Sequence, residues 1–392
     1  MPEANGGRAE DDRRVAIESS LLRTVVRAEI EARRPPAGGP FDVHAHTGVD
    51  VDGSARTCDE HVADLEALGA RSATFPLCVT TGYAAENRRV VDESRRHPDR
   101  LVPFARIDPR TPRPGAVAAD ALAAGARGLK LHPRAEAFAI DQPGVGEIVV
   151  VASAARVPLV VHAGRGVGSF GAPLLELARR HRGCRIVLAH AGISDLGWLW
   201  RELDDHPNLL FDTAWWNPAD LLALFALVPP GRILWGSDAP YGEVDVGLAI
   251  TLRCARAAGL SDDALALIVG GQLDALLAGD DPLDAGPPPA PRESAPSPIE
   301  ARALSALTGL GGCMIGGGDV AELFALARLA VEPLRDGGDP VGALVADLFD
   351  EIVVSPADAQ SALVLALTLA ATPRLGVAEA VSDDLAAGAV AT

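Results

Sequence analysis

Five residues that could bind a metal ion each follow a short apolar run in this sequence. They are spread over almost two hundred positions and comprise His44, His46, His162, His190 and Asp238. Imidazole nitrogens and carboxylate oxygens are the ligands that catalytic zinc sites use. If the apolar runs are parallel strands closed into a barrel, all five side chains would meet at the C-terminal mouth of that barrel. The pattern therefore predicts a catalytic metal centre.

The spacing within these runs strengthens the prediction. Side chains alternate between faces along a strand, so His44 and His46 point the same way, roughly 6.6 Å apart along the backbone. An isolated His-x-His pair is weak evidence, but His162 and His190 also end apolar runs, and Ala-Gly follows each of them. Two such endings are hard to attribute to packing. Asp238, in the segment Trp-Gly-Ser-Asp-Ala-Pro, would read as a turn or capping residue if the histidines were missing.

Two further residues lie on a strand of this kind. Lys130 is the only lysine in the chain and stands in the segment Gly-Leu-Lys-Leu-His that ends at His132. Lysine can lose its proton and present a compact amine, whereas arginine cannot. We therefore expect a chemical role for Lys130, the alternative being chance survival in a codon-biased genome. His132 either lines the pocket or supports a turn. The remaining histidines are expected at the surface, namely His61, His97, His181 and His206.

Several residues after the strands could contact a substrate. Arg106, Arg134 and Arg165 could bind a carboxylate as a fork, although for any single one a surface arginine is the favoured interpretation. Trp215 and Trp216 follow the seventh predicted strand, so a planar substrate is conceivable, with core packing as the alternative.

Strand-like and helix-like segments alternate regularly through the middle of the chain. The strand-like segments are rich in Val, Ile and Leu, as expected of strands covered on both faces. We assign them to residues 41–45, 72–77, 101–107, 127–132, 158–162, 185–190, 208–212 and 232–236. Eight strand–helix units in this length predict a (β/α)8 TIM barrel. The rival is an open doubly wound sheet, but its Gly-rich phosphate turn is absent after the first strand.

The chain divides into four regions. Residues 1–37 form a polar tail and a helix, which apolar spacing places at 15–33 and the Pro35-Pro36 pair ends. Residues 38–280 form the barrel, and 281–298 form a Pro-rich linker. Residues 299–392 read as about four helices that form a bundle, lie on the barrel or contact a second subunit, so a homodimer is one arrangement they allow. We identify no chemistry in this last region.

Composition narrows the classes of function. The 392 residues carry a net charge of −18, which would repel nucleic acid and anionic membranes. The five cysteines are far apart and odd in number, as expected of reduced thiols. The N-terminus has no apolar stretch of the signal-peptide type. The longest apolar run, 361–371, is too short to cross a bilayer, which takes about 20 residues. We expect a cytoplasmic protein with a small-molecule substrate.

The strand-end motifs resemble the amidohydrolase superfamily. They are His44-Ala-His46 and the segments 128–133, 161–164, 188–192 and 235–240. The set is most similar to the amidohydrolase-related branch that includes aminocarboxymuconate-semialdehyde decarboxylase and γ-resorcylate decarboxylase. The resemblance covers residues 41 to about 277. It departs from the family at Gln272-Leu273, where Asn-Ala is more common, and this position is expected to be structural.

The resemblance implies a particular metal centre. His44, His46, His162 and Asp238 would bind one divalent metal, and His190 would stand beside it as an acid, a base or an oxyanion stabiliser. Three histidines and one carboxylate suit Zn²⁺ best, although Mn²⁺, Fe²⁺ or Co²⁺ would be accepted. In other branches the equivalent of Lys130 is carboxylated and bridges two metals. We place the one-metal interpretation ahead of this binuclear one.

Three functions follow from this centre. The first is a hydrolase that activates water to attack an amide, lactone or ester carbon, with Asp238 as the proton acceptor. The second is a cofactor-free, metal-dependent decarboxylase of a small carboxylic acid. The third is a catalytically inactive barrel that serves as a scaffold for the C-terminal helices.

Overall fold

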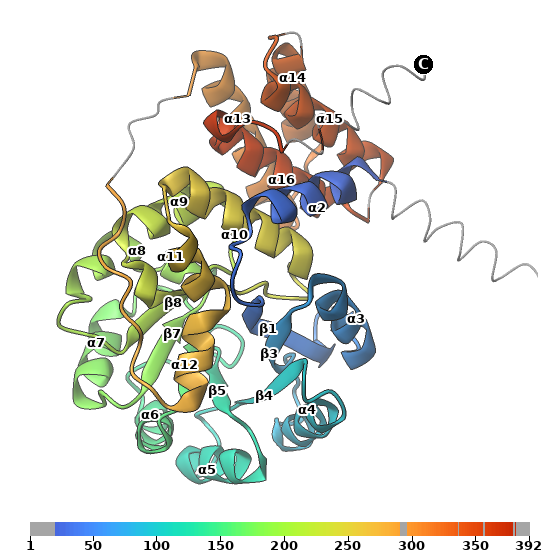
Figure 1. The fold of residues 1–392 in the computed structure, drawn as a ribbon. Helices are drawn as coiled ribbons and strands as arrows, with labels where there is room; N and C mark the ends of the chain where they lie inside the picture. The colour runs from blue at the N-terminus through green and yellow to red at the C-terminus, as the bar shows by residue number, and fades with distance from the viewer. Residues whose placement is uncertain (1–19, 291–295, 336, 356, 379–380, 382–392) are drawn as a thin grey trace, which may run out of the picture.

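The computed structural model describes residues 20–290, 296–335, 337–355, 357–378 and 381, and eight parallel strands form the centre of this described part (Figure 1). The strands run in chain order around the sheet. They are β1 (Phe41–Val49), β3 (Arg71–Pro76), β4 (Leu101–Arg106), β5 (Gly128–Leu131), β6 (Pro158–Val161), β7 (Arg185–Leu188), β8 (Leu209–Asp212) and β9 (Ile233–Leu234). A short strand, β2 (Ala55–Arg56), pairs antiparallel with the end of β1.

The sheet closes on itself between its last and first parallel strands. Val43 in β1 donates its backbone N–H to the carbonyl of Trp235, just after β9, at 3.0 Å. Asp238 donates its backbone N–H to the carbonyl of His44 at 2.8 Å. These bonds join β1 to the chain that follows β9, and they confirm the (β/α)8 prediction.

Helices follow the strands and form the outer layer of the barrel (Figure 1). They are α3 (Cys58–Leu68), α4 (Ala84–Arg96), α5 (Pro114–Ala124), α6 (Pro143–Ala155), α7 (Gly171–Arg180), α8 (Leu196–Leu199), α9 (Pro218–Leu227), α10 (Val244–Ala258), α11 (Asp262–Ala266) and α12 (Gln272–Ala278). The shorter helical turns are η1 (His190–Gly192), η2 (Trp200–Glu202), η3 (Pro230–Arg232), η4 (Leu267–Gly271) and η5 (Pro373–Leu375). Local sequence sets their ends. In α3, for example, Thr57 and Glu60 form a reciprocal capping box.

The strands are buried on both faces. Their inward side chains form a separate apolar cluster inside the barrel, which includes Phe41, Phe75, Phe104, Val187 and Leu210. Their outward side chains pack under the helices. This two-sided burial explains why the strands read as nearly continuous apolar runs.

The N-terminal helix packs against the barrel. α2 (Leu21–Arg33) begins after its N-cap residue Ser20 and ends before the proline pair. Residues 15–19 of the predicted helix lie outside the described part of the chain. A buried ion pair of 2.9 Å between Glu29 in α2 and Arg253 in α10 joins this helix to the barrel.

The C-terminal region forms a helical bundle above the barrel, in contact with α2, α9 and α10 (Figure 1). The described residues there form four main helices, as predicted. They are α13 (Pro298–Gly316), α14 (Ala321–Arg335), α15 (Pro340–Val354) and α16 (Ala359–Ala371).

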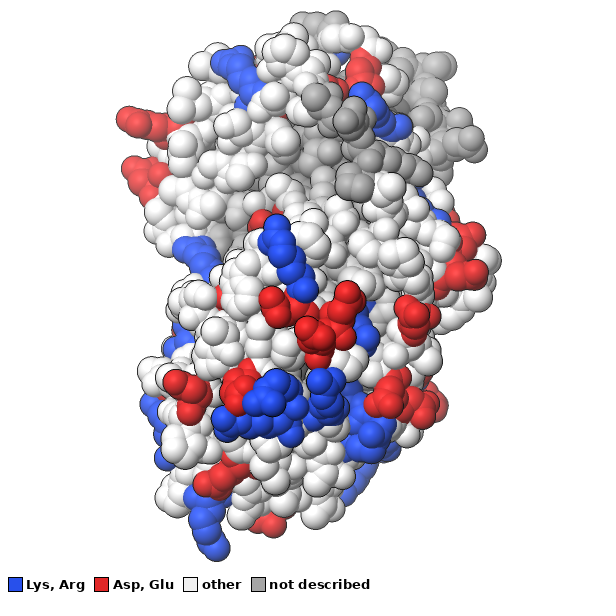
Figure 2. Space-filling view, turned by 90° about the vertical axis from the view of Figure 1, so that its left-hand side faces the viewer, with Lys and Arg blue, Asp and Glu red and all other residues white. Residues whose placement is uncertain are grey.

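Charged side chains are unevenly spread over the surface. Acidic and basic groups lie next to one another on the barrel half of the face in Figure 2, whereas the described residues over the C-terminal helices show fewer charged groups, mostly toward the edges of the view. Within the described residues, no helix combines the length and apolar character that a membrane span needs.

Candidate metal centre

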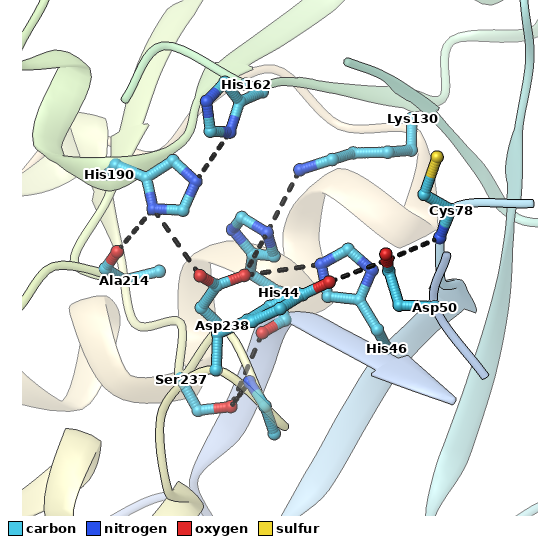
Figure 3. Close-up of polar contacts among 12 residues, drawn as sticks. His44, His46, Asp50, Cys78, Lys130, His162, His190, Ala214, Ser237 and Asp238 are labelled. Carbon is cyan, nitrogen blue, oxygen red and sulfur yellow. Dashed lines mark hydrogen bonds and ion pairs between the residues drawn. The ribbon is translucent and has the colours of Figure 1, made fainter. Parts of the chain in front are cut away.

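The middle of β1, which continues to Val49 beyond its predicted end, and the loop after β9 bring three of the predicted residues together (Figure 3). His44 and His46 extend from β1 toward Asp238, which lies in the loop after β9. Asp238 Oδ1 is 3.1 Å from His44 Nε2 and 3.3 Å from His46 Nε2. Both imidazoles are buried, while the Asp238 side chain is 20% exposed and so faces the pocket.

Two of these strand-end residues have unusual backbone conformations. Asp238 and His190 adopt φ values of 60° and 59°, in the left-handed region that non-glycine residues rarely enter. Hydrogen bonds hold both of them. Asp238 donates its N–H to the His44 carbonyl, and His190 donates its N–H to Asp212 Oδ1 at 2.7 Å. The turn at His190 also explains why β7 ends at Leu188, two residues before the predicted end. Backbone strain of this kind clusters at functional sites.

A fixed oxygen atom lies against one ring nitrogen of each candidate histidine. Two of these oxygens serve the β1 histidines. His44 Nδ1 lies 2.7 Å from Asp212 Oδ2, and His46 Nδ1 lies 3.4 Å from the Pro76 carbonyl. These oxygens can only accept, so with Nδ1 as the donor of each neutral ring, Nε2 keeps a lone pair. Both lone pairs then face the carboxylate of Asp238, which also only accepts.

The second pair of histidines repeats this arrangement. His190 Nδ1 donates to the Ala214 carbonyl at 2.7 Å, and His162 Nε2 donates to the Arg165 carbonyl at 3.2 Å. The remaining nitrogens, His190 Nε2 and His162 Nδ1, then face each other at 2.9 Å with two lone pairs. Such contacts between acceptors are unfavourable unless a cation neutralises them. Metal-bound histidines commonly donate their second N–H to a carboxylate or carbonyl in this way, so the donor set fits a divalent metal.

The predicted ligands are not equally close to one another. Among the described residues, His44, His190 and Asp238 form the compact group, with one ligand atom from each lying within 4.8 Å of the others. Asp238 Oδ2 lies 3.9 Å from His190 Nδ1. His162 contacts this group through His190, and its ring stacks on His132 with centroids 3.9 Å apart.

Burial and charge together keep His46, His162 and Asp238 in their metal-binding forms and favour a positive charge at His44. Burial lowers the pKa of His46 to about 3 and lowers that of His162 further, so both are neutral. Burial would raise the pKa of Asp238, but His44 and His190 outweigh it and hold this pKa well below its usual value. Burial and Lys130 lower the pKa of His44, yet Asp212 and Asp238 outweigh them and raise it. The site thus favours positive charge at His44, which a metal could supply in place of a proton.

Asp212, at the end of β8, is a site residue that the sequence analysis missed. Its side chain is fully buried and accepts three hydrogen bonds, from His44 Nδ1 and from the backbone N–H groups of His190 and Ala214. It therefore fixes two of the candidate residues at once. The only sequence signal was its position, directly after the apolar run Leu-Leu-Phe that forms β8.

Lys130 lies inside the barrel beside the candidate ligands. Its Nζ atom is 3.0 Å from His44 Nε2, and the side chain is fully buried. Burial lowers its pKa to about 8. The amine therefore contacts the same nitrogen that faces Asp238, and its proton and a metal would compete for that lone pair.

The remaining predicted residues line one cavity of about 590 Å³ at the barrel mouth. His132, Arg134, Arg165 and Trp215 all belong to its wall. Trp215 is fixed by a 2.6 Å hydrogen bond from its indole N–H to Asp220. The volume is within the usual range for pockets that bind small molecules.

The structure corrects three of the expectations. Arg106 is not a surface residue, because it is buried and forms a 2.7 Å ion pair with Glu136 while lining the cavity. His61 is fully buried, and neither ring nitrogen has a hydrogen-bond partner in the described chain. His206 is also buried, and its Nδ1 donates to the Glu202 carbonyl at 2.7 Å. Each lies on a face that packs inward, which local spacing did not reveal.

Comparisons with known proteins agree with this architecture. No curated protein matches the chain. Among solved structures, 2,6-dihydroxybenzoate decarboxylase from Rhizobium is similar over 62% of this chain and 99% of its own, with 14% identity and a TM-score of 0.50. 5-Carboxyvanillate decarboxylase from Sphingomonas paucimobilis is similar over 62% of this chain and 99% of its own, with 15% identity and a TM-score of 0.49. At these identities the likeness is one of fold alone.

The family is established separately, from the sequence. The model of the amidohydrolase family matches residues 41–271, which is more than half of the chain and includes every candidate ligand. The buried Gln272, where the chain departs from the family pattern, binds the Gly231 carbonyl and the Leu283 N–H and so has a structural role. With the barrel and its strand-end residues in place, this chain belongs to the amidohydrolase family.

Proposed function

We propose that the chain is a metal-dependent hydrolase that acts on an amide, lactone or ester carbon of a small molecule. The observation that supports this proposal is that His44 and His46 both turn Nε2 toward Asp238, at 3.1 and 3.3 Å, while their Nδ1 atoms lie against fixed oxygens. In the proposed centre, His44, His46, His162 and Asp238 hold one divalent ion. Zinc suits three nitrogen ligands and one carboxylate best.

A bound metal of this kind polarises a carbonyl and lowers the pKa of water from about 15.7 to 7. Asp238 would accept the proton of the attacking water, because its Oδ2 faces the pocket side of the centre near His190. The same carboxylate would then pass the proton to the leaving group. When protonated, His190 can stabilise an oxyanion beside the centre, because its Nδ1 lies 3.9 Å from Asp238 Oδ2. Loss of one such donor typically costs about 10²–10³ in rate.

Decarboxylation of a small carboxylic acid is the second candidate, and two arginines favour it. Arg134 and Arg165 line the cavity with exposed side chains, and neither guanidinium forms an ion pair within the described residues. Either could orient a carboxylate. His190 or Asp238 would then protonate the carbon that loses CO2. The similar solved barrels named above are decarboxylases, which is consistent with this candidate at the level of fold.

One experiment tests the metal centre and separates the two reactions. The full-length protein is purified, its metal-to-chain ratio is measured, and it is incubated with lactones, esters, amides and hydroxylated aromatic acids. We expect about one equivalent of metal and a hydrolysed acid as the product. Release of CO2 would instead establish the second candidate. A chain that retains no stoichiometric metal, even after incubation with zinc, manganese or cobalt, would refute both and favour the scaffold interpretation.

A further inference from the structure

The cavity at the barrel mouth has a second wall that comes from outside the barrel. Residues from two C-terminal helices line it together with the candidate ligands: Ile315 and Gly316 from α13, and Gln360, Ser361 and Val364 from α16. These lining residues lie more than forty residues beyond the part of the chain that the family model matches. The sequence analysis assigned no role in the site to this region.

Polar contacts attach the start of α16 to the loop that carries Asp238. Gln360 Nε2 donates to the Tyr241 carbonyl at 3.1 Å, and Ser361 Oγ donates to Glu243 Oε1 at 2.7 Å. Tyr241 stands only three residues after Asp238. The second wall is therefore anchored directly to the segment that positions a candidate metal ligand.

An ion-pair cluster adds a third element to this anchor. Arg23 in α2 binds Asp358, the N-cap residue of α16, at 2.8 Å. The same guanidinium binds Glu243 at 2.5 Å and Asp245 at 3.1 Å, at the start of α10. One arginine thus ties α16 to both the barrel and the N-terminal helix. Because several charges share it, the cluster fixes the geometry better than an isolated surface pair would.

Glycines bring α13 equally close to the barrel. A Cβ added at Gly311 would lie 2.8 Å from the ring of Trp216, and one added at Gly316 would lie 3.2 Å from Arg165 Nη2. Any side chain at Gly311 would force the helix away from the barrel loops. The helix is therefore packed directly over residues that follow β6 and β8.

We propose that α13 and α16 form the substrate-facing wall opposite the metal centre and set the length and shape of the substrate. Val364 and Ile315 line the same cavity as Val246 and Ile250 of α10, so we expect the part of the substrate that contacts this wall to be apolar. The proposal rests on the proposed function, because it assumes that the substrate reacts at the metal centre.

The test uses the full-length chain loaded with Co²⁺, whose visible spectrum changes when a carboxylate binds. Acetate, benzoate and biphenyl-4-carboxylate serve as probes of increasing length. In Val364→Trp, the larger ring would fill the cavity beside the wall. We expect acetate to bind as in the wild type and biphenyl-4-carboxylate to bind about tenfold more weakly or worse, because a filled pocket cannot accept extra atoms without displacing packed ones.

Two further variants keep the test decisive. Ile315→Trp reaches the same cavity from α13 at a half-buried position, so it tests the wall even if Val364→Trp folds poorly. Val353→Trp is the matched control, because Val353 is 53% exposed on α15 and does not line the cavity. If the Val364→Trp and Ile315→Trp variants bind all three acids as the wild type does, the proposed role of α13 and α16 is refuted, but the proposed metal centre is not. A wild-type chain that takes up no cobalt would overturn the proposed function itself.

Discussion

Replacing Asp212 by asparagine tests the metal centre through a residue that touches no proposed substrate. In the wild type, Asp212 Oδ2 accepts the proton of His44 Nδ1 at 2.7 Å and so leaves the lone pair on Nε2. Its other oxygen accepts two backbone N–H groups, which hold His190 and Ala214. Asparagine keeps the shape and one acceptor oxygen. That oxygen stays with the backbone N–H groups, so the amide NH2 is turned toward His44.

The consequence is a change of tautomer. Facing an NH2 donor, His44 Nδ1 becomes the acceptor and Nε2 takes the proton, so this nitrogen no longer offers a lone pair to the metal. The centre also loses a buried negative charge that raises the pKa of His44. Removing a carboxylate that supports a metal-bound histidine usually weakens metal affinity by about 10- to 100-fold. This corresponds to about 1.4–2.7 kcal/mol of binding free energy.

The assay is competition of the metal-loaded protein against a chelator of known affinity, for the wild type and Asp212→Asn. Asp220→Asn is the matched control, because Asp220 accepts the N–H of Trp215 near the pocket but contacts none of the candidate ligands. Thermal unfolding of the metal-free proteins shows whether the variants are folded. Unchanged metal affinity in a folded Asp212→Asn protein would refute the assignment of the His44 tautomer and the metal centre built on it.

Three other substitutions give independent tests. His44→Ala should remain folded by circular dichroism but lose its metal, and full metal content in elemental analysis would contradict the ligand assignment. Lys130→Arg should reduce turnover although it keeps the charge, because the buried Nζ lies 3.0 Å from His44 and leaves no room for a guanidinium; wild-type turnover would leave codon bias as the explanation. His61→Leu should reduce the loss of stability in acid. Burial lowers the pKa of His61 from 6.5 to about 3, so between these pH values only the unfolded chain binds its proton. Its contribution to stability is therefore complete above pH 6.5 and is lost by about 1.4 kcal/mol per pH unit as the pH falls. Urea unfolding at pH 7.5 and 5.0 measures this difference, and equal losses in both proteins would contradict the prediction.

Much of the barrel could be predicted because its signals are local. Strands covered on both faces must be apolar throughout, and the segments between them carry helical spacing, so each of the eight parallel strands overlaps a predicted one. The polar residues at the strand ends stood out against these apolar runs. The predicted strand ends were less accurate. For example, β7 ends two residues before its predicted end, close to His190, whose backbone adopts a left-handed conformation.

The residues that the sequence analysis missed depend on contacts between distant segments. Nothing near Asp212 indicates that it would bind His44, 168 positions away in the chain. Arg106 appeared to be a surface residue until the structure placed Glu136 beside it. His61 belongs to a helix whose inward face is settled only by packing on the barrel. Burial and contacts between distant segments determine the roles of these residues, and neither can be predicted from the local spacing of residues.

The amino-acid sequence by itself determined the type of barrel and most of the candidate residues at its mouth. Both depend on patterns among residues that are close together in the sequence, namely hydrophobic periodicity and polar residues that follow apolar runs. Only the tertiary structure decided which nitrogen of each histidine faces inward, since that depends on oxygens supplied by other strands and loops. It also decided that α13 and α16 line the cavity. Their placement results from the anchoring of Gln360, Ser361 and Asp358 on the barrel and on α2, across more than one hundred residues of chain.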